Sequence, residues 1–457
     1  MNIPKLIQHQ RKFFANQETK NINYRKNTLN RLLKELIKRE SEIIKALYDD
    51  FKKPEYEAVM TETSIVISEL KMTIKNIRSW SKPKRVLPSI LNFPSSAKIY
   101  KEPYGTVLII APWNYPYQLA FSPLIGAIAA GNTIVVKPSE LTPNTSKIIK
   151  QIIETVFAPN HVAVIEGGVT VAQELLAQRW DYIFFTGSVP VGKIVAKAAA
   201  EHLTPVTLEL GGKSPCIVDN TANIKLAAKR IVWGKFINGG QTCIAPDYLL
   251  IHKTVKESFV DYFREEISKA YGKNPNESPD YPRIVNTKNF DRLVKMLTNE
   301  KVLIGGQTDK NSNYISPTLL NEPSLDSEVM KGEIFGPIFP VISYENEHDI
   351  EQITSKYDKP LALYVFTNRS SFAKKIIKRY SFGGGTINDT TVHFANNRLP
   401  FGGVGESGIG GYHGKQTFDT FSHKKGIVTR GTWLDIPTRY APYKGKLKQL
   451  KTLMKLG

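Results

Sequence analysis

The chain has 457 residues, of which 41% are hydrophobic and 23% charged, so it is long enough for two or three packed domains and too apolar to be disordered. Its two cysteines, Cys216 and Cys243, exclude a disulfide scaffold and a cysteine-rich zinc site, and free thiols are typical of a reducing compartment such as the cytoplasm. The net charge of +20 is spread along the whole chain without a zinc-finger or helix-turn-helix pattern, so no nucleic-acid partner is expected.

We expect neither a signal peptide nor a membrane-spanning helix. The first 14 residues lack an uninterrupted apolar run and a small-residue cleavage site. No run of 18 apolar residues occurs in the sequence. The eight histidines show no H-x-x-x-H spacing, so we expect no metal site.

Residues 1–80 predict helices, because apolar residues recur at intervals of three and four, as at Leu32, Leu36, Ile43 and Leu47. Prolines at positions 83, 88 and 94 end this region. The stretch that follows, SSAKIYKEPYG, predicts an extended segment.

From about residue 104, short apolar runs alternate with helical patterns. GTVLIIAPW, NTIVVKPSE, HVAVIEGG and DYIFFTGS predict four buried strands, with three helices between them. This alternation indicates a doubly wound α/β sheet, which binds its ligands beyond the carboxyl ends of the strands. Those ends carry Trp113, Asn114, Lys137, Glu140, Gly187 and Ser188.

A second α/β unit is predicted from about residue 210 to 385, with strand-like runs YLLIH, PLALYVFT and GGGTIN. The final residues, GKLKQLKTLMKLG, are basic and amphipathic, with Leu447, Leu450 and Met454 on one face. Three interpretations of this tail stay open: contact with a membrane, a helix over a substrate entrance, or a solvated end.

The run GSVPVGK has the glycine and lysine spacing of a phosphate-binding P-loop. Ile194 stands where the magnesium-binding Ser or Thr would be, which argues against a nucleoside-triphosphate site. A strand, a Gly-rich turn and a helix start can still hold a dinucleotide through backbone N–H groups. The usual G-x-G-x-x-G fingerprint of a Rossmann fold is absent.

The two cysteines have different surroundings. Cys216 lies among apolar residues and is interpreted as a small buried hydrophobe. Cys243 follows the polar, Gly-rich run NGGQT, where a ligand could approach the backbone closely. From this local sequence alone, Cys243 is either a buried hydrophobe or a nucleophile.

Two glutamates are candidate acid–base groups. Glu209 lies between Leu208 and Leu210, so it is either a buried acid with satisfied hydrogen bonds or a general base with a raised pKa. Glu333, in GEIFGP, is equally compatible with a helix cap or a surface acid.

Together these segments resemble the aldehyde dehydrogenase superfamily, most closely its class 3 branch, which acts on fatty and aromatic aldehydes. The resemblance runs from about residue 100 to 425 and, more weakly, into the N-terminal helices. It rests on an ordered series of motifs: APWNYP, GNTIVVKPSE, FFTGSVPVGK, LELGGKSP, GKFINGGQTCIAPDY, EIFGP and LPFGGVGESGIGGYHG.

The resemblance implies a role for each matching residue. Cys243 matches the family's nucleophile, Glu209 its general base and Asn114 the side-chain donor of its oxyanion hole. The positions that match its cofactor-binding residues are Trp113, Lys137 and Glu140, Gly187 and Ser188, and Glu333 and Phe335. The family binds NAD through a variant Rossmann domain without the usual fingerprint, so that absence is no objection.

The resemblance also implies a domain arrangement. Residues 1–83 and 103–208 are expected to form the NAD-binding domain, 209–386 the α/β catalytic domain, and 84–102 with 415–432 a small β bridging arm. Residues 387–414 are expected to return to the cofactor domain, and 433–457 to form the basic tail. A homodimer joined by the arm is the expected assembly.

The implied function is the oxidation of medium- or long-chain aliphatic or aromatic aldehydes, with NAD and possibly NADP. Glu209 predicts release of a carboxylic acid, because members that form acyl-coenzyme A lack this residue. Two alternatives are a peripheral membrane-associated scaffold, suggested by the basic tail, and an NAD-independent thiol esterase on the same fold.

Overall fold

The computed structural model describes residues 2–89 and 92–455. Positions 90–91 of the predicted arm and 456–457 of the predicted tail therefore lie outside the described residues. Leu32, Leu36, Ile43 and Leu47 are fully buried, as their spacing predicts. The N-terminal helices are α1 (Ile3–Ala15), α2 (Ile22–Lys38), α3 (Glu40–Phe51), α4 (Glu55–Ala58) and α5 (Ser64–Trp80), with one π-helical turn, η2 (Val59–Thr63), before α5.

The first sheet has the strand order β17-β7-β6-β3-β4-β5, and all of its strands are parallel except β17. Its strands are β3 (Thr106–Ile110), β4 (Thr133–Lys137), β5 (Val162–Val164), β6 (Tyr182–Thr186), β7 (Val206–Glu209) and β17 (Gly408–Ile409). The chain runs outward from β3 to β5 and then returns to place β6 and β7 on the other side of β3. The strand order therefore reverses between β3 and β6, which is the switch point where such sheets bind ligands.

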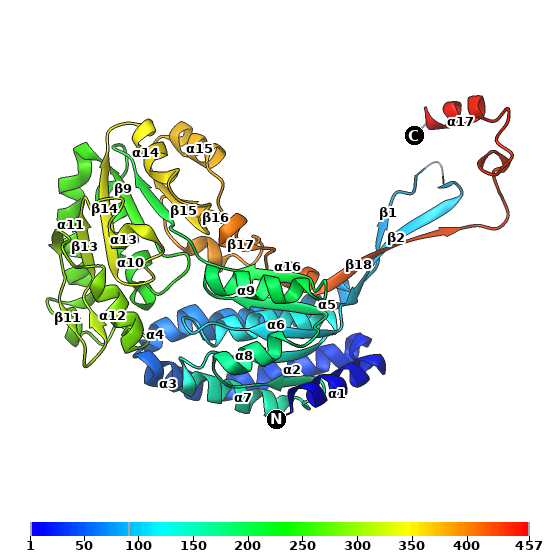
Figure 1. Cartoon of the computed structure of the whole chain (residues 1–457), viewed down its shortest axis with the longest axis horizontal. Coiled ribbons are helices and arrows are strands. Elements are labelled where there is room, and N and C mark those ends of the chain that lie inside the picture. The colour runs from blue at the N-terminus through cyan, green and yellow to red at the C-terminus, as the bar shows by residue number, and fades with distance from the viewer. Residues whose placement is uncertain (1, 90–91, 456–457) are drawn as a thin grey trace.

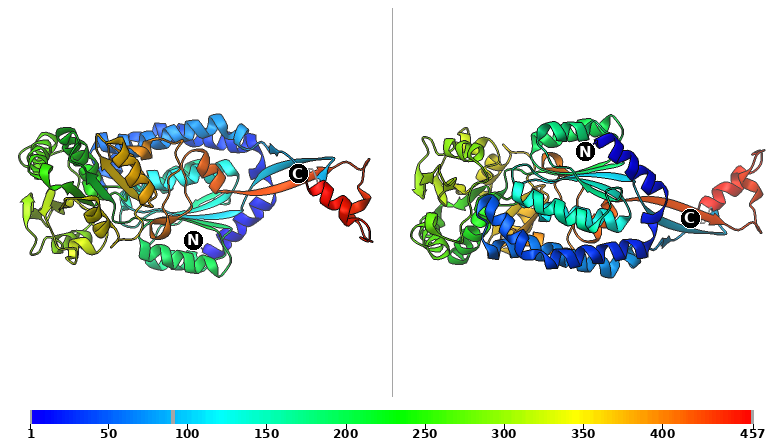
Figure 2. Two further views of the ribbon diagram at one scale, coloured as in Figure 1. Left: turned by 90° about the horizontal axis from the view of Figure 1, so that it is seen from above. Right: turned by 90° about the horizontal axis from the view of Figure 1, so that it is seen from below.

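Helices cover both faces of this sheet (Figure 2). Alternate residues of β3 point to opposite faces: Val107 and Ile109 join one core cluster and Leu108 and Ile110 another. The first cluster includes α2, α3, α5 and two helices of the sheet, α6 (Gln118–Ala130) and α7 (Pro143–Val156). The second includes α1, α8 (Val169–Leu176) and α9 (Val189–Ala200).

The second sheet has the order β10-β13-β14-β9-β8-β15-β16 and is parallel apart from β10. Its strands are β8 (Pro215–Val218), β9 (Tyr248–His252), β10 (Val302–Ile304), β13 (Thr318–Asn321), β14 (Ile338–Tyr344), β15 (Ala362–Phe366) and β16 (Gly384–Ile387). The helices of this unit are α10 (Ile224–Phe236), α11 (Lys256–Tyr271), α12 (Thr287–Lys295), α13 (Glu328–Lys331), α14 (Glu347–Thr354) and α15 (Ser370–Arg379). A small hairpin, β11 (Thr308–Asp309) and β12 (Tyr314–Ile315), lies beside it.

Two mainly parallel sheets with helices on their faces confirm the predicted α/β class. The chain passes from the first sheet to the second between Glu209, the last residue of β7, and Pro215, the first of β8. The exact domain limits given above stay a prediction.

A three-stranded antiparallel sheet projects from the body of the molecule, and the C-terminal helix α17 (Leu447–Met454) lies at its far end (Figures 1 and 2). It consists of β1 (Lys84–Val86), β2 (Ser95–Pro103) and β18 (Ser422–Arg430). Residues 415–420, which the sequence assigned to this arm, instead form helix α16 (Lys415–Thr420) on the surface of α6. They do so because Phe418 is buried there and Thr417 fits against Gly126, so the arm begins at Ser422.

Candidate active site

The carboxyl ends of β3, β4, β6 and β7 bring several predicted site residues to one edge of the first sheet. Lys137 is the last residue of β4 and Glu209 the last of β7. Gly187 and Ser188 connect β6 to α9, and the loop after β3 carries Trp113 and Asn114. Residues distant in the sequence thus share the edge at which parallel strands bind ligands.

Cys243 reaches this edge on a tight turn that follows α10. In the 3-10 segment η4 (Ile237–Gly240), Asn238, Gly239 and Gly240 have φ angles of 55°, 63° and 73°. A Cβ at position 240 would collide with the carbonyl of Gly336, so the chain requires glycine there. The Gly-rich run before Cys243 therefore serves close packing of backbone against backbone.

Cys243 and Glu209 line the same cavity, which encloses about 200 Å³ and is walled mainly by apolar side chains. The apolar wall is formed by Met60, Ile65, Leu119, Trp233, Ile237, Ile244, Leu361, Val392, Phe394 and Phe401. Polar groups enter it at a few points, among them Thr186, Thr242 and Tyr412. A cavity of this kind suits an apolar molecule with one reactive polar end.

Glu209 is not a buried acid with satisfied hydrogen bonds. Its side chain is 3% exposed, and neither carboxylate oxygen has a hydrogen-bond partner within the described residues. Burial raises the pKa of this carboxyl well above its usual range. Burial makes the ionised carboxylate a stronger base than an exposed one, and its two oxygens are not engaged by other groups.

The pKa of the Cys243 thiol is raised by burial and, further, by the carboxylates of Glu333 and Glu209. The backbone N–H groups of Cys243 and Ile244 act in the opposite direction. Because the thiolate is the nucleophilic form, this cysteine needs either a base or an added positive charge before it reacts.

Asn114 is tied to the loop that carries Cys243. Its side-chain Nδ2 donates to the backbone carbonyl of Gln241 at 3.1 Å, and both residues are buried. An amide nitrogen has two N–H groups, so this bond leaves one donor for another acceptor. Asn114 is thereby placed beside the nucleophile loop with a donor to spare.

The edge of the sheet fits a dinucleotide. Ser188, the N-cap of α9, makes no side-chain hydrogen bond to the helix, so its side chain does not compete with an anion for the backbone N–H groups of the first turn. A Cβ on Gly187 would lie 2.5 Å from the ring of Phe185, so the turn has no room for a side chain at this position. Lys137 and Glu140 form an ion pair of 2.6 Å at the end of β4, where ribose hydroxyls find both a donor and an acceptor.

Glu333 and Phe335 lie between α13 and β14, so Glu333 is neither a helix cap nor a fully exposed surface acid. The ring of Phe335 contacts that of Trp113 edge-on, with centroids 5.2 Å apart. The Glu333 carboxylate lies directly over Gly211, where a Cβ would collide with it. Burial, together with the charge of Asp247, raises its pKa to about 8.

Sequence reasoning missed three polar residues of this site. Tyr115 and Thr242 join their hydroxyls at 2.6 Å beside Cys243, and the buried hydroxyl of Tyr412 has no partner within the described chain. Tyr115 and Tyr412 lie in the motifs NYP and GGYHG, but the motifs gave no reason to single them out. No group of three or more potential metal ligands occurs within residues 2–89 and 92–455.

The chain matches the model described as the aldehyde dehydrogenase family over residues 1–427. It is 49% identical over 445 residues to the 4,4'-diaponeurosporen-aldehyde dehydrogenase of Staphylococcus aureus, with 97% of each chain covered. It is 43% identical over 455 residues to aldehyde dehydrogenase family 3 member H1 of Arabidopsis thaliana, which covers 98% of this chain and 94% of the relative. Among solved structures, the substrate-bound state of Staphylococcus aureus AldH is similar with a TM-score of 0.98 at 48% identity, covering 99% of this chain and 100% of that one.

Proposed function

The chain belongs to the aldehyde dehydrogenase family, and we propose that Cys243, Glu209 and Asn114 carry its reaction, in which an aldehyde becomes a carboxylic acid. The protein oxidises aldehydes with NAD(P) and is similar to class 3 members. The observation that carries the assignment of roles is that the thiol of Cys243 and the unpartnered carboxylate of Glu209 share one apolar cavity. The two alternatives, an inactive scaffold and an NAD-independent esterase, are not favoured.

The first step is addition of the Cys243 thiolate, the form that the last step regenerates, to the aldehyde carbon. A C–S bond forms, and the carbonyl electrons move to oxygen, which becomes an alkoxide. The free N–H of the Asn114 amide and the backbone N–H of Cys243 are the donors for that oxygen. Loss of one such donor typically lowers the rate by roughly 10²–10³.

A dinucleotide held at the edge of the first sheet would supply the acceptor for the hydride that leaves the tetrahedral carbon, and its positive charge would favour the thiolate of Cys243. A thioester then remains on the cysteine. Glu209 takes a proton from water, the resulting hydroxide attacks the thioester carbon, and the C–S bond breaks to give the acid and the thiolate, after which Glu209 releases its proton to solvent. The two unengaged oxygens of Glu209 in the cavity that also holds Cys243 support this role.

Replacing the nucleophile and the base tests these roles separately. Cys243→Ala should abolish aldehyde oxidation while the protein still binds NAD, and continued turnover would exclude Cys243 as the nucleophile. Glu209→Gln should keep a rapid burst of NADH but slow the steady state, because only hydrolysis needs the base. A variant with normal steady-state turnover but no burst would contradict this division.

The proposed substrates are long, apolar aldehydes, medium- or long-chain aliphatic or aromatic. The apolar wall of the cavity supports this, and a 49% identical relative is named for 4,4'-diaponeurosporen-aldehyde. A steady-state screen of aldehydes of graded chain length, run with NAD and with NADP, would define the substrate. A kcat/KM that falls as the chain lengthens would contradict the proposal.

For the cofactor, Lys137 and Glu140 are proposed to hold the adenosine ribose, and Gly187 with Ser188 the pyrophosphate. Trp113, Glu333 and Phe335 are assigned to the nicotinamide side. Glu140 accepts hydrogen bonds from ribose hydroxyls and repels a 2′-phosphate, so NAD should bind more tightly than NADP.

The proposed assembly is a homodimer joined through the arm. β18 is an edge strand of the arm, and Ile427 and Val428 on it are exposed by 42% and 50%. β16 is an edge strand of the second sheet, with Ile387 exposed by 45%. Two unpaired edges with apolar side chains are suited to pairing across copies. Val428→Asp or Ile387→Asp should produce monomers in sedimentation velocity, and an unchanged dimer would contradict this interface.

The tail from residue 433 is proposed to contact membranes from the cytoplasmic side. Within the described part of the chain, no helix has the length and apolar character needed to cross a bilayer. The tail nevertheless exposes Trp433, Tyr443, Leu447, Leu450 and Met454 among lysines, as interfacial helices do. Sedimentation with anionic liposomes should fall when residues 443–457 are removed, and equal partitioning would contradict membrane contact.

A further inference from the structure

The turn before Cys243 contains one residue whose identity the backbone does not explain. Asn238, Gly239 and Gly240 all adopt left-handed φ angles. Glycine occupies two of these positions, as expected for that conformation. Asparagine tolerates it less well than glycine, so a side chain at position 238 must contribute something else.

The Asn238 side chain links the two loops that carry the proposed oxyanion donor and the nucleophile. Its Nδ2 donates to the backbone carbonyl of Asn114 at 2.9 Å and to that of Gln241 at 3.2 Å. The Gln241 carbonyl also accepts the bond from the Asn114 side chain at 3.1 Å. Both backbone and side chain of Asn114 are thus fixed relative to a peptide two residues from Cys243.

The turn is itself anchored from two sides. Glu57, on α4, accepts the backbone N–H of Asn238 at 3.0 Å. The Gln241 side chain donates to the carbonyls of Asn238 and Arg283 at 3.0 and 3.1 Å and accepts the N–H of Val285 at 3.0 Å. Asn238 and Gln241 are fully buried. The turn therefore has little freedom to move, and Asn238 transmits this rigidity to Asn114.

We propose that Asn238 is a positioning residue for aldehyde oxidation: its amide holds Asn114 so that the remaining N–H of that side chain points at the alkoxide formed on Cys243. Glu57 supports it by holding the Asn238 backbone. The proposal rests on the role of Asn114 proposed above. A displacement of about 1 Å of such a donor can lower a rate by roughly 10²-fold, so geometry rather than binding is what Asn238 supplies.

The test compares variants that remove the amide in different ways. Asn238→Gly keeps the left-handed turn and loses only the side chain, whereas Asn238→Asp keeps the shape and replaces the two donors by an acceptor facing two carbonyls. The matched control is Asn299→Gly, because Asn299 is exposed and also left-handed at φ 65°. Both Asn238 variants should slow the NADH burst by roughly 10- to 100-fold with less than about a threefold change in aldehyde KM, and the control should change neither.

A second readout separates positioning from general damage. With para-substituted benzaldehydes, weaker support of the alkoxide makes the burst rate depend more steeply on electron withdrawal by the substituent. Asn238→Gly should steepen this dependence while NAD affinity and the titratable thiol of Cys243 stay unchanged. A folded variant with a wild-type burst and slope, or one whose loss is entirely in NAD affinity, would overturn the proposal.

Variants of Glu57 provide an independent test if the Asn238 variants do not fold. Glu57→Gln keeps an oxygen that accepts the Asn238 N–H and should retain the burst, whereas Glu57→Ala should slow it. Equal bursts in both would overturn the proposal. Asn114→Ala separates the proposed role of Asn114 from that of Asn238. If Asn114→Ala leaves the burst unchanged, the proposed role of Asn114 is wrong. If Asn114→Ala slows the burst and the Asn238 and Glu57 variants do not, only the positioning role of Asn238 is wrong.

Discussion

The two mainly parallel sheets each have a switch point, but among the described residues only that of the first sheet leaves buried polar atoms without hydrogen-bond partners. In the first sheet, the order reverses between β3 and β6, and the nearby strand ends hold the unpartnered oxygens of Thr186 and Glu209. In the second sheet it reverses between β8 and β15, whose ends carry Asp219 and Thr367. Topology alone thus offers two candidate ligand sites.

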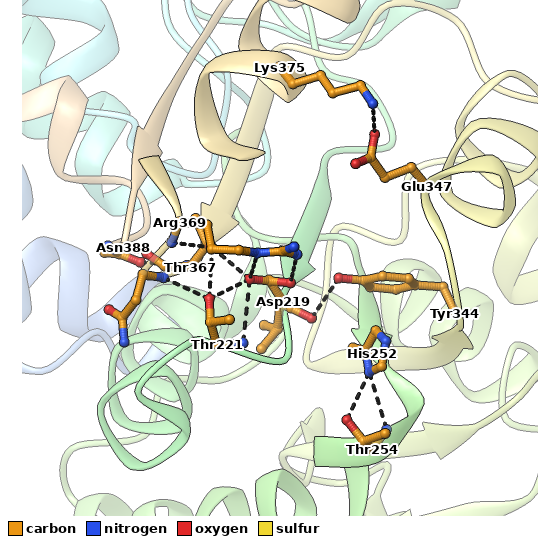
Figure 3. A network of polar contacts seen from close by, with 12 residues as sticks. Asp219, Thr221, His252, Thr254, Tyr344, Glu347, Thr367, Arg369, Lys375 and Asn388 are labelled. Atoms are coloured by element: carbon orange, nitrogen blue, oxygen red, sulfur yellow. Dashed lines mark hydrogen bonds and ion pairs between the residues drawn. The ribbon is translucent and has the colours of Figure 1, made fainter. Parts of the chain in front are cut away.

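The second switch point is closed by its own side chains (Figure 3). The buried Asp219 carboxylate accepts hydrogen bonds from Thr221 at 2.5 Å, Thr367 at 2.7 Å and Arg369 at 2.5 Å. Asn388 in turn exchanges two hydrogen bonds with the Thr367 backbone, at 2.8 and 2.9 Å. A ligand there would have to displace satisfied bonds, whereas at the first switch point it would satisfy open ones. Unpaired groups, more than topology, distinguish a functional strand end from a structural one.

The largest expected effect comes from removing the Asp219 carboxylate at the switch point of the second sheet. Asp219→Ala leaves the hydroxyls of Thr221 and Thr367 and the Arg369 guanidinium without their acceptor, which should lower the free energy of unfolding by about 2–4 kcal/mol. Because this site is structural, kcat and KM for the folded variant should stay at the wild-type value. Urea denaturation and steady-state assays on the same samples measure both.

The matched control lies on the same edge of the second sheet. Lys375 pairs with Glu347 at 2.6 Å, but both side chains are about half exposed, so Lys375→Ala should cost less than about 1 kcal/mol. If Asp219→Ala lowered kcat without loss of stability, the second switch point would have a functional role and the comparison would fail.

An intermediate effect is expected from adding a methyl group to Gly187, in the turn between β6 and α9 at the switch point of the first sheet. In Gly187→Ala, the added Cβ would lie 2.5 Å from the buried Phe185 ring and push the β6–α9 turn out of place. NAD affinity, measured by fluorescence titration, should fall about 10-fold or more, corresponding to about 1.4 kcal/mol or more. Reaction of the Cys243 thiol with a small alkylating reagent should continue, because its loop is separate. Unchanged NAD affinity would remove this turn from the cofactor site.

The strand-helix alternation predicted the fold well where local signals are strong. The four buried runs between 104 and 188 each contain a strand of the first sheet, and the apolar spacing of the N-terminal helices matches their buried faces. The limit of the arm could not be predicted from local sequence. Residues 415–420 form α16 instead of continuing the arm because Thr417 fits against Gly126, and these two residues are distant in sequence.

Contacts between residues distant in sequence also explain which site residues could be predicted and which could not. Cys243, Glu209 and Asn114 were identified by motif resemblance, and local sequence alone left Cys243 and Glu209 undecided. That Glu209 lacks hydrogen-bond partners depends on what surrounds it in space. Asn238 was visible only as part of a polar, Gly-rich run, because its role depends on the Asn114 carbonyl, 124 positions away.

The smallest expected effect concerns the charge that closes the second switch point. Arg369 is half exposed, so Arg369→Ala should lower the free energy of unfolding by only about 0.5–1 kcal/mol at neutral pH.

Burial tends to raise the pKa of Asp219, but hydrogen bonds from Arg369, Thr221 and Thr367 and the Arg369 charge outweigh it, so the folded pKa lies below the usual value. A carboxyl with a depressed pKa stabilises the fold above its unfolded pKa and loses that contribution as pH falls through the folded value. The difference between wild type and Arg369→Ala should therefore be constant above about pH 5 and shrink below about pH 4, as followed by urea denaturation at each pH. A difference that grew on acidification would mean that the guanidinium stabilises something other than the Asp219 carboxylate.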